Sequence, residues 1–198
     1  EDIRNARRYL SSLKIYDSIE SLNFQTLNKD TRPEEIVSLL GPAFQGLNMG
    51  IISEAGCPGI ADPGALAAIC AHENSIQVVP LVGPSSLLLA LMASGLNGQR
   101  FAFHGYLPID NQECAKTIRA LEKESMQKNQ TQVVIETPYR NNQVKDALLK
   151  NLKNETLLTI AIDITGEQEK IATQSVKAWK TVEYKIPKLP GVFLFLSA

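Results

Sequence analysis

The segment from Ser53 to Gly64, Ser-Glu-Ala-Gly-Cys-Pro-Gly-Ile-Ala-Asp-Pro-Gly, most constrains what this chain can fold into. It carries three glycines and two prolines in twelve residues, after the apolar pair Ile51-Ile52 and before a helical pattern. Glycine permits backbone angles and close approaches that a Cβ forbids, and proline fixes φ. A purely structural connection between a strand and a helix needs only about 2–6 residues. The length and composition therefore predict a rigid loop at the end of a strand, where open α/β sheets bind small ligands.

A second loop of the same character, Leu81 to Ser86, follows the strand-like residues 77–79. Two successive units of strand, loop and helix with little side-chain bulk suggest one ligand that is held by main-chain groups. Taken alone, Gly83-Pro84 is equally typical of a simple helix start. The patterns Gly-x-x-x-x-Gly-Lys-Ser/Thr and Gly-x-Gly-x-x-Gly do not occur in the sequence, so a nucleoside-triphosphate loop is not expected.

Segments with helical and with β-like patterns alternate along the chain, which predicts an α/β protein with parallel βαβ units. The later strands are less cleanly separated by helices, so some antiparallel pairing is expected there. Because Glu1 is not preceded by a methionine, we expect an earlier strand and its loop to be missing from this sequence. The expected helices cover residues 4–13, 33–47 with Thr31 as the N-cap, 63–70 with Asp62 as the N-cap, 84–94, 111–128, 139–152 and 175–180. The expected strands cover residues 49–53, 75–81, 101–103, 131–136, 156–164 and 191–196.

Composition limits the class of protein. A chain of 198 residues can bury a real core. Its net charge of −1 argues against coating nucleic acid through bulk charge, although a local basic patch is compatible with it. The longest apolar run, residues 87–93, is far shorter than the roughly 20 residues that span a bilayer. The odd number of scattered cysteines is typical of reduced thiols in a cytoplasmic protein, and no metal site is expected: the cysteines are Cys57, Cys70 and Cys114.

Several loop motifs occur in an order that resembles the SAM-dependent tetrapyrrole methylase superfamily, in particular its small-subunit ribosomal RNA 2′-O-ribose methyltransferases. The similarity covers nearly the whole chain. The matching stretches are Glu1–Arg4, Ser53–Pro58, Asp62–Gly64, Val82–Ser85, Gly105–Pro108, Glu136–Arg140 and Asp163–Gly166. The chain also departs from the family pattern: Tyr139 replaces a histidine, Gly166 a lysine, Asp163 a glutamate and Cys57 a threonine.

The resemblance implies two α/β domains, residues 1–97 with a parallel sheet and residues 98–198 with a mixed sheet, joined by a hinge at residues 97–99. It also implies a ligand cleft between them, S-adenosylmethionine (SAM) as the cofactor, a homodimer and a cytoplasmic protein. The residues that would line the cofactor are Ser53, Glu54, Ala55, Gly56, Gly83, Pro84, Ser85, Asp163, Ile164 and Thr165.

Glu54, Glu136 and Arg140 are the candidate catalytic residues, because a hydroxyl nucleophile needs a proton acceptor and a phosphate needs a cation. Asp62 and His104 are weaker candidates, since Asp62 is equally typical of a helix cap and His104 of a half-buried structural residue. Arg4, Arg7 and Arg8 are further candidate phosphate contacts, although Arg7-Arg8 is also typical of a solvated helix face. Tyr106 and Tyr139 are candidates for stacking on a base, and packing at the core or rim is the plain alternative.

The leading hypothesis is therefore a SAM-dependent methyltransferase that acts on a ribose 2′-hydroxyl of small-subunit ribosomal RNA, with that RNA or the small subunit as its partner. Two alternatives stay open at this point. One is a methylase of the same fold that acts on a small molecule such as a tetrapyrrole. The other is a SAM-binding module without catalytic activity.

Overall fold

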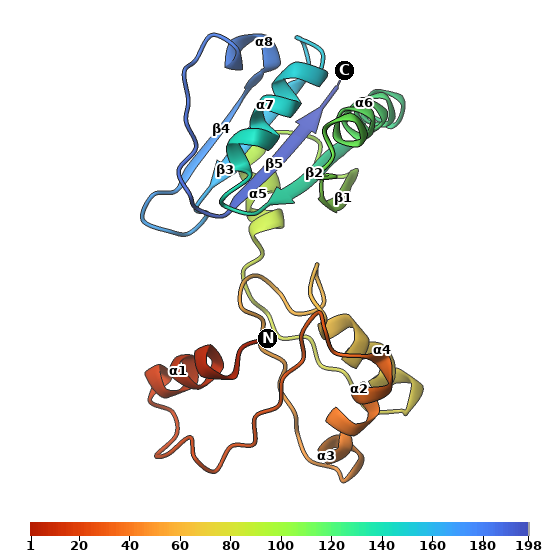
Figure 1. The fold of residues 1–198 in the computed structure, drawn as a ribbon, viewed down its shortest axis with the longest axis vertical. Coiled ribbons are helices and arrows are strands. Elements are labelled where there is room, and N and C mark those ends of the chain that lie inside the picture. Colours follow the sequence, from red (N-terminus) through yellow and green to blue (C-terminus); the bar gives the residue numbers. More distant parts are fainter. Residues whose placement is uncertain (198) are drawn as a thin grey trace. The chain divides into compact units, whose positions relative to one another are not determined.

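The computed structural model describes residues 1–197, which divide into two compact units (Figure 1). The first unit runs from Glu1 to Pro84, and the second begins at Ser85. The second unit holds a five-stranded sheet with helices on both faces, so the predicted α/β class is confirmed. The two domains expected with a boundary between residues 97 and 98 stay a prediction.

The sheet of the second unit is mixed and has the strand order β1-β2-β5-β3-β4. The central strand β5 is antiparallel to both of its neighbours, β2 and β3, while β1 and β2 are parallel. The strands are β1 (Phe101–Tyr106), β2 (Thr131–Glu136), β3 (Leu157–Ile162), β4 (Lys170–Ser175) and β5 (Gly191–Leu196). This pairing places the carboxyl ends of β1, β2 and β3 at one edge of the sheet, together with the start of β5.

Helices pack on both faces of this sheet because its central strands are apolar on both sides (Figure 1). Helix α5 (Ser86–Ser94) lies on the face that carries Val192 and Leu194. Helices α6 (Asn111–Lys128) and α7 (Asn141–Asn151) and the short α8 (Val176–Trp179) pack on the face of Phe193 and Phe195. The residues of β5 after Gly191 are all apolar, and such a run is typical of a strand that is buried on both faces.

A chain of hydroxyl groups fastens the end of α5 to the sheet. The Thr173 hydroxyl donates to the Ser94 carbonyl oxygen at 2.8 Å, and it lies 2.7 Å from the fully buried Thr159 hydroxyl. Gly95, with φ of 71°, ends the helix directly after residue 94, the last residue of the predicted helix. Asn97 is then fixed within the second unit, because its side-chain amide donates to the Asn129 carbonyl oxygen. Residues 97–99, expected as a hinge, are thus held in place within this unit.

The first unit contains four helices and a small core, and it lacks the parallel sheet that the sequence predicts, as far as residues 1–84 are described. The prediction of strands at residues 49–53 and 75–81 was wrong. A strand requires a ladder of hydrogen bonds to a neighbour, and neither segment has one in this structure. Their apolar side chains are correspondingly exposed, for example Val79 at 62% and Leu81 at 89%. The helices are α1 (Ile3–Leu13), α2 (Pro33–Leu39), α3 (Gly41–Phe44) and α4 (Gly64–Glu73).

Two further differences have local causes. The helix expected to run to residue 47 is divided at Leu40, where Pro42 cannot donate a backbone hydrogen bond and disfavours a continuous helix. Its N-cap is Arg32 and not Thr31, and the Arg32 amide donates to the Glu35 carboxylate at 3.0 Å.

No helix among residues 1–197 is both long and apolar enough to cross a membrane.

Candidate functional site

The loop from Ser53 to Gly64 is organised around the carboxylate of Asp62. Its Oδ1 accepts hydrogen bonds from the amides of Gly59 at 2.9 Å and Gly64 at 2.7 Å, and its Oδ2 accepts one from the Ser53 hydroxyl at 2.6 Å. Partial burial alone raises the pKa of Asp62, but these three hydrogen bonds outweigh it and hold the pKa below its ordinary value. Asp62 therefore closes the loop as an ionised carboxylate, and it also binds the first amide of α4.

Glycine is required at two positions of this loop. Gly56 has φ of 73° and Gly59 has φ of 81°, in the left-handed region that residues with a Cβ rarely adopt. The predicted cofactor residues Ala55 and Gly56 are exposed, and an added Cβ at Gly56 would meet no atom within 4 Å. The loop therefore presents main chain to open space, as the sequence predicts.

The two glycine- and proline-rich loops meet within the first unit. The Cys57 thiol lies 3.5 Å from the carbonyl oxygen of Pro84, which it contacts as a weak donor. Gly83 next to it is exposed, and a Cβ there would also meet nothing within 4 Å. Glu54 is exposed as well, and its Oε2 accepts a hydrogen bond from the Asn5 side chain of α1 at 2.9 Å. The contact between Cys57 and Pro84 joins residues 27 positions apart, and no local pattern in the sequence indicates it.

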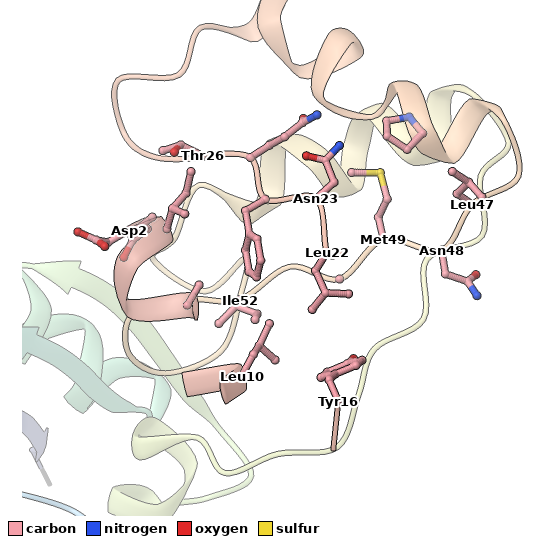
Figure 2. Close-up of a pocket in the computed structure, with 17 residues that line it drawn as sticks. Asp2, Leu10, Tyr16, Leu22, Asn23, Thr26, Leu47, Asn48, Met49 and Ile52 are labelled. Carbon is pink, nitrogen blue, oxygen red and sulfur yellow. The ribbon is translucent and has the colours of Figure 1, made fainter. Parts of the chain in front are cut away.

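The first unit also contains a cavity of about 490 Å³ that the sequence did not indicate. Figure 2 shows Leu10, Leu22 and Ile52, which come from three separate segments and line it together with residues such as Asn23 and Met49. Within the described chain, none of the predicted cofactor residues lines this cavity. Ile52, one of the residues that line it, directly precedes the loop that begins at Ser53.

In the second unit, the remaining predicted residues follow strands whose carboxyl ends share one edge of the sheet. Glu136 ends β2, Asp163 follows β3, and Tyr106 ends the neighbouring strand β1. Ile164 and Thr165 line a hollow of about 360 Å³ with Leu89 and Met92 of α5. Ser85 is the N-cap residue of α5 and is half-buried.

The turn after β3 is held in an unusual backbone conformation. Asp163 and Thr165 have φ of 52° and 69°, which for residues with side chains is typical of a constrained segment. The Asp163 carboxylate folds back and accepts the Gln168 amide at 2.9 Å. A Cβ at Gly166 would lie only 2.3 Å from the atoms of that carboxylate. Glycine at 166, where the family pattern has lysine, therefore makes room for the Asp163 side chain.

Glu136 and Arg140 form an ion pair at the end of β2. Arg140 Nη1 lies 2.9 Å from Glu136 Oε2, and the Glu136 side chain is 1% exposed. Glu136 Oε1 accepts the Thr137 amide, and Arg140 Nη2 donates to the Pro108 carbonyl oxygen at 3.3 Å. Glu136 Oε2 and Arg140 Nε lack a well-directed hydrogen bond among residues 1–197. Arg140 thus connects the loop after β1 to the loop after β2, and its catalytic role stays a prediction.

His104, the other weak candidate, lies on β1 with its Nε2 at 2.5 Å from the amide oxygen of Gln132. Within the part of the chain that the structure describes, no three His, Cys, Asp or Glu residues are grouped so that they could hold a metal ion.

Comparison with known proteins identifies relatives along most of this chain. No family model matches it. The ribosomal RNA small subunit methyltransferase I of Synechocystis is 32% identical over 170 residues, which cover 85% of this chain and 57% of that protein. The protein of the same name from Xylella fastidiosa is 39% identical over 108 residues, or 54% of this chain and 38% of that protein. The matched residues thus span less than two thirds of both curated relatives, 57% of the first and 38% of the second.

The fold has a matching solved structure as well. The methyltransferase CobJ superposes with a TM-score of 0.62 at 15% identity, over 92% of this chain and 78% of CobJ. In sequence and in fold, the chain is similar to the SAM-dependent tetrapyrrole methylase superfamily. The loop motifs that carry the resemblance lie around Asp62, Pro84, Glu136 and Asp163.

We predict that Asp62→Ala will loosen the loop from Ser53 to Gly64. Hydrogen exchange of the Gly59 and Gly64 amides should become at least tenfold faster, because both lose their shared acceptor. The folded pKa lies below the ordinary value of about 3.9. The stabilisation by Asp62 is therefore fully present above about pH 4 and is lost as the pH falls through the lower folded pKa. Replacement of the exposed Asp17 by alanine is the control, and equal exchange in both variants would contradict this role of Asp62.

We predict that Arg140→Ala will lower the free energy of unfolding of the second unit by about 2–4 kcal/mol, since it leaves the buried Glu136 carboxylate without its cation. Urea unfolding followed by the fluorescence of Trp179 measures this change. Adding Glu136→Gln to the variant should recover much of the loss, and the exposed Arg119→Ala should cost less than about 1 kcal/mol. Full stability of Arg140→Ala would show that the ion pair does not brace this edge.

Proposed function

We propose that this protein is a SAM-dependent methyltransferase that methylates a ribose 2′-hydroxyl of small-subunit ribosomal RNA. The main support is the sequence relationship, over 85% of the chain, to a protein named ribosomal RNA small subunit methyltransferase I. The matched loops support it, because they combine exposed main chain with a fixed conformation. Since the chain spans only part of those relatives, its activity and its substrate are both part of the proposal.

The loops suit SAM chemically. The cofactor has a cationic sulfonium and many polar groups, so it favours carbonyl oxygens and nearby negative charge over basic side chains. The main-chain groups of Gly56 and Gly83 form no backbone hydrogen bond among the described residues and border open space. We propose ten residues as cofactor-binding residues. They are Ser53, Glu54, Ala55, Gly56, Gly83, Pro84, Ser85, Asp163, Ile164 and Thr165.

When bound, SAM supplies a methyl group that an oxygen nucleophile can take in a single displacement. The protein must then orient the ribose hydroxyl and accept its proton. Glu54 is the better candidate acceptor, because it is exposed and its Oε1 forms no hydrogen bond within residues 1–197. Glu136 is buried and already paired with Arg140, which favours a positioning role for both residues.

We also propose that the protein works as a homodimer in the cytoplasm, where its ribosomal substrate is found. Helix α5 offers exposed Leu88 and Met92 for such contacts. Sedimentation of the full chain decides the oligomeric state.

We predict that the full chain transfers methyl groups from radiolabelled SAM to small ribosomal subunits from a strain that lacks this gene. Gly83→Val should abolish SAM binding in calorimetry, because the new side chain would fill the open space that the proposal gives to the cofactor. It should not lower stability, since a Cβ at Gly83 meets no atom within 4 Å and its φ is ordinary. Gly98→Val is the matched control, since Gly98 has the same open surroundings and lies outside the loops. If wild-type protein binds neither SAM nor S-adenosylhomocysteine, the proposed function is wrong.

A further inference from the structure

Two neighbouring loops of the second unit expose large side chains at the carboxyl edge of its sheet. Tyr106 at the end of β1 is 55% exposed, Ile109 in the loop that follows is 76% exposed, and Tyr139 after β2 is 82% exposed. Strands β1 and β2 are adjacent, and Tyr106 is in register with Ile135. Exposed apolar and aromatic residues that gather on adjacent loops mark an interaction surface. We call these three residues the tyrosine patch.

A cation accompanies the most exposed ring of the patch. The Lys188 ammonium lies 5.4 Å from the centroid of the Tyr139 ring, and Lys188 forms no salt bridge among residues 1–197. Of the carboxylates next to the patch in sequence, Glu136 pairs with Arg140, and Asp110 accepts the first amides of α6. Lys188 is therefore free to meet an anionic partner beside the ring.

The patch is held in place by polar contacts, buried at Glu136 and exposed at Asp110. Arg140 joins Glu136 at the end of β2 to the Pro108 carbonyl between Tyr106 and Ile109. Asp110 fixes the start of α6 on the other side of Ile109. A surface that is ordered before binding loses less conformational entropy when it binds a partner.

We propose that Tyr106 and Tyr139, with Lys188 beside Tyr139, bind unpaired nucleotides of the RNA substrate. Flat, amphipathic rings stack on bases, and a free cation next to a ring can bind the phosphate that follows the base. This inference rests on the proposed function, which makes RNA the substrate. A protein surface is the other class of partner, but it gives no reason for a cation at the ring.

The test uses the full chain and a twelve-nucleotide unstructured RNA that carries 2-aminopurine, whose fluorescence falls when it stacks. We expect Tyr139→Ala and Tyr106→Ala each to weaken binding about tenfold, with loss of the stacking signal for Tyr139→Ala. Tyr139→Phe, which keeps the ring, should stay within twofold of wild type. Lys188→Ala should lower the slope of log affinity against log salt by about 0.7.

Tyr9→Ala is the matched control, since Tyr9 is as exposed as Tyr106, at 55%, but lies in the first unit. SAM affinity and thermal stability should be unchanged in all these variants. If the tyrosine variants bind RNA like wild type while wild type still methylates small subunits, the patch proposal is wrong and the proposed function stands. If wild type binds no RNA and methylates no subunits, both proposals fail.

Discussion

The carboxylate of Asp62 is the interaction on which the proposed site depends. It is a single side chain, yet it accepts hydrogen bonds from the Ser53 hydroxyl and from the amides of Gly59 and Gly64. These bonds satisfy polar groups that a tightly turned loop cannot pair within itself. Because the carboxylate is used in this way, it serves as scaffold. The main chain of Ala55 and Gly56 is left exposed, as the proposed cofactor site requires.

Much of the second unit follows from local sequence. The predicted helix at 111–128 and the predicted strands at 131–136 and 191–196 agree with α6, β2 and β5 to the residue. Strand β4 (Lys170–Ser175) was missed because its side chains are only half-buried, so its apolar signal is weak. In the first unit, the apolar segments 49–53 and 75–81 have strand-like sequences without strand partners. Pairing depends on distant residues, which local patterns do not report.

The candidate site was predictable in its residues and less so in its contacts. The sequence predicts that glycine in this loop permits backbone angles that a Cβ forbids, and the φ of 73° at Gly56 confirms this prediction. The contact of Cys57 with Pro84 and the position of Lys188 over Tyr139 join residues far apart in sequence, so no motif could reveal them. Gly166 has a plain physical account, because the carboxylate of Asp163 fills the space of its missing side chain.

Hydrogen–deuterium exchange with and without S-adenosylhomocysteine tests the central claim most directly. That claim is that the two glycine- and proline-rich loops, which touch through Cys57 and Pro84, together receive a methyl donor. The account predicts that the ligand slows exchange in peptides covering residues 53–64 and in those covering residues 81–85. Saturating ligand that leaves both loops unprotected, or that protects only other parts of the chain, would contradict it.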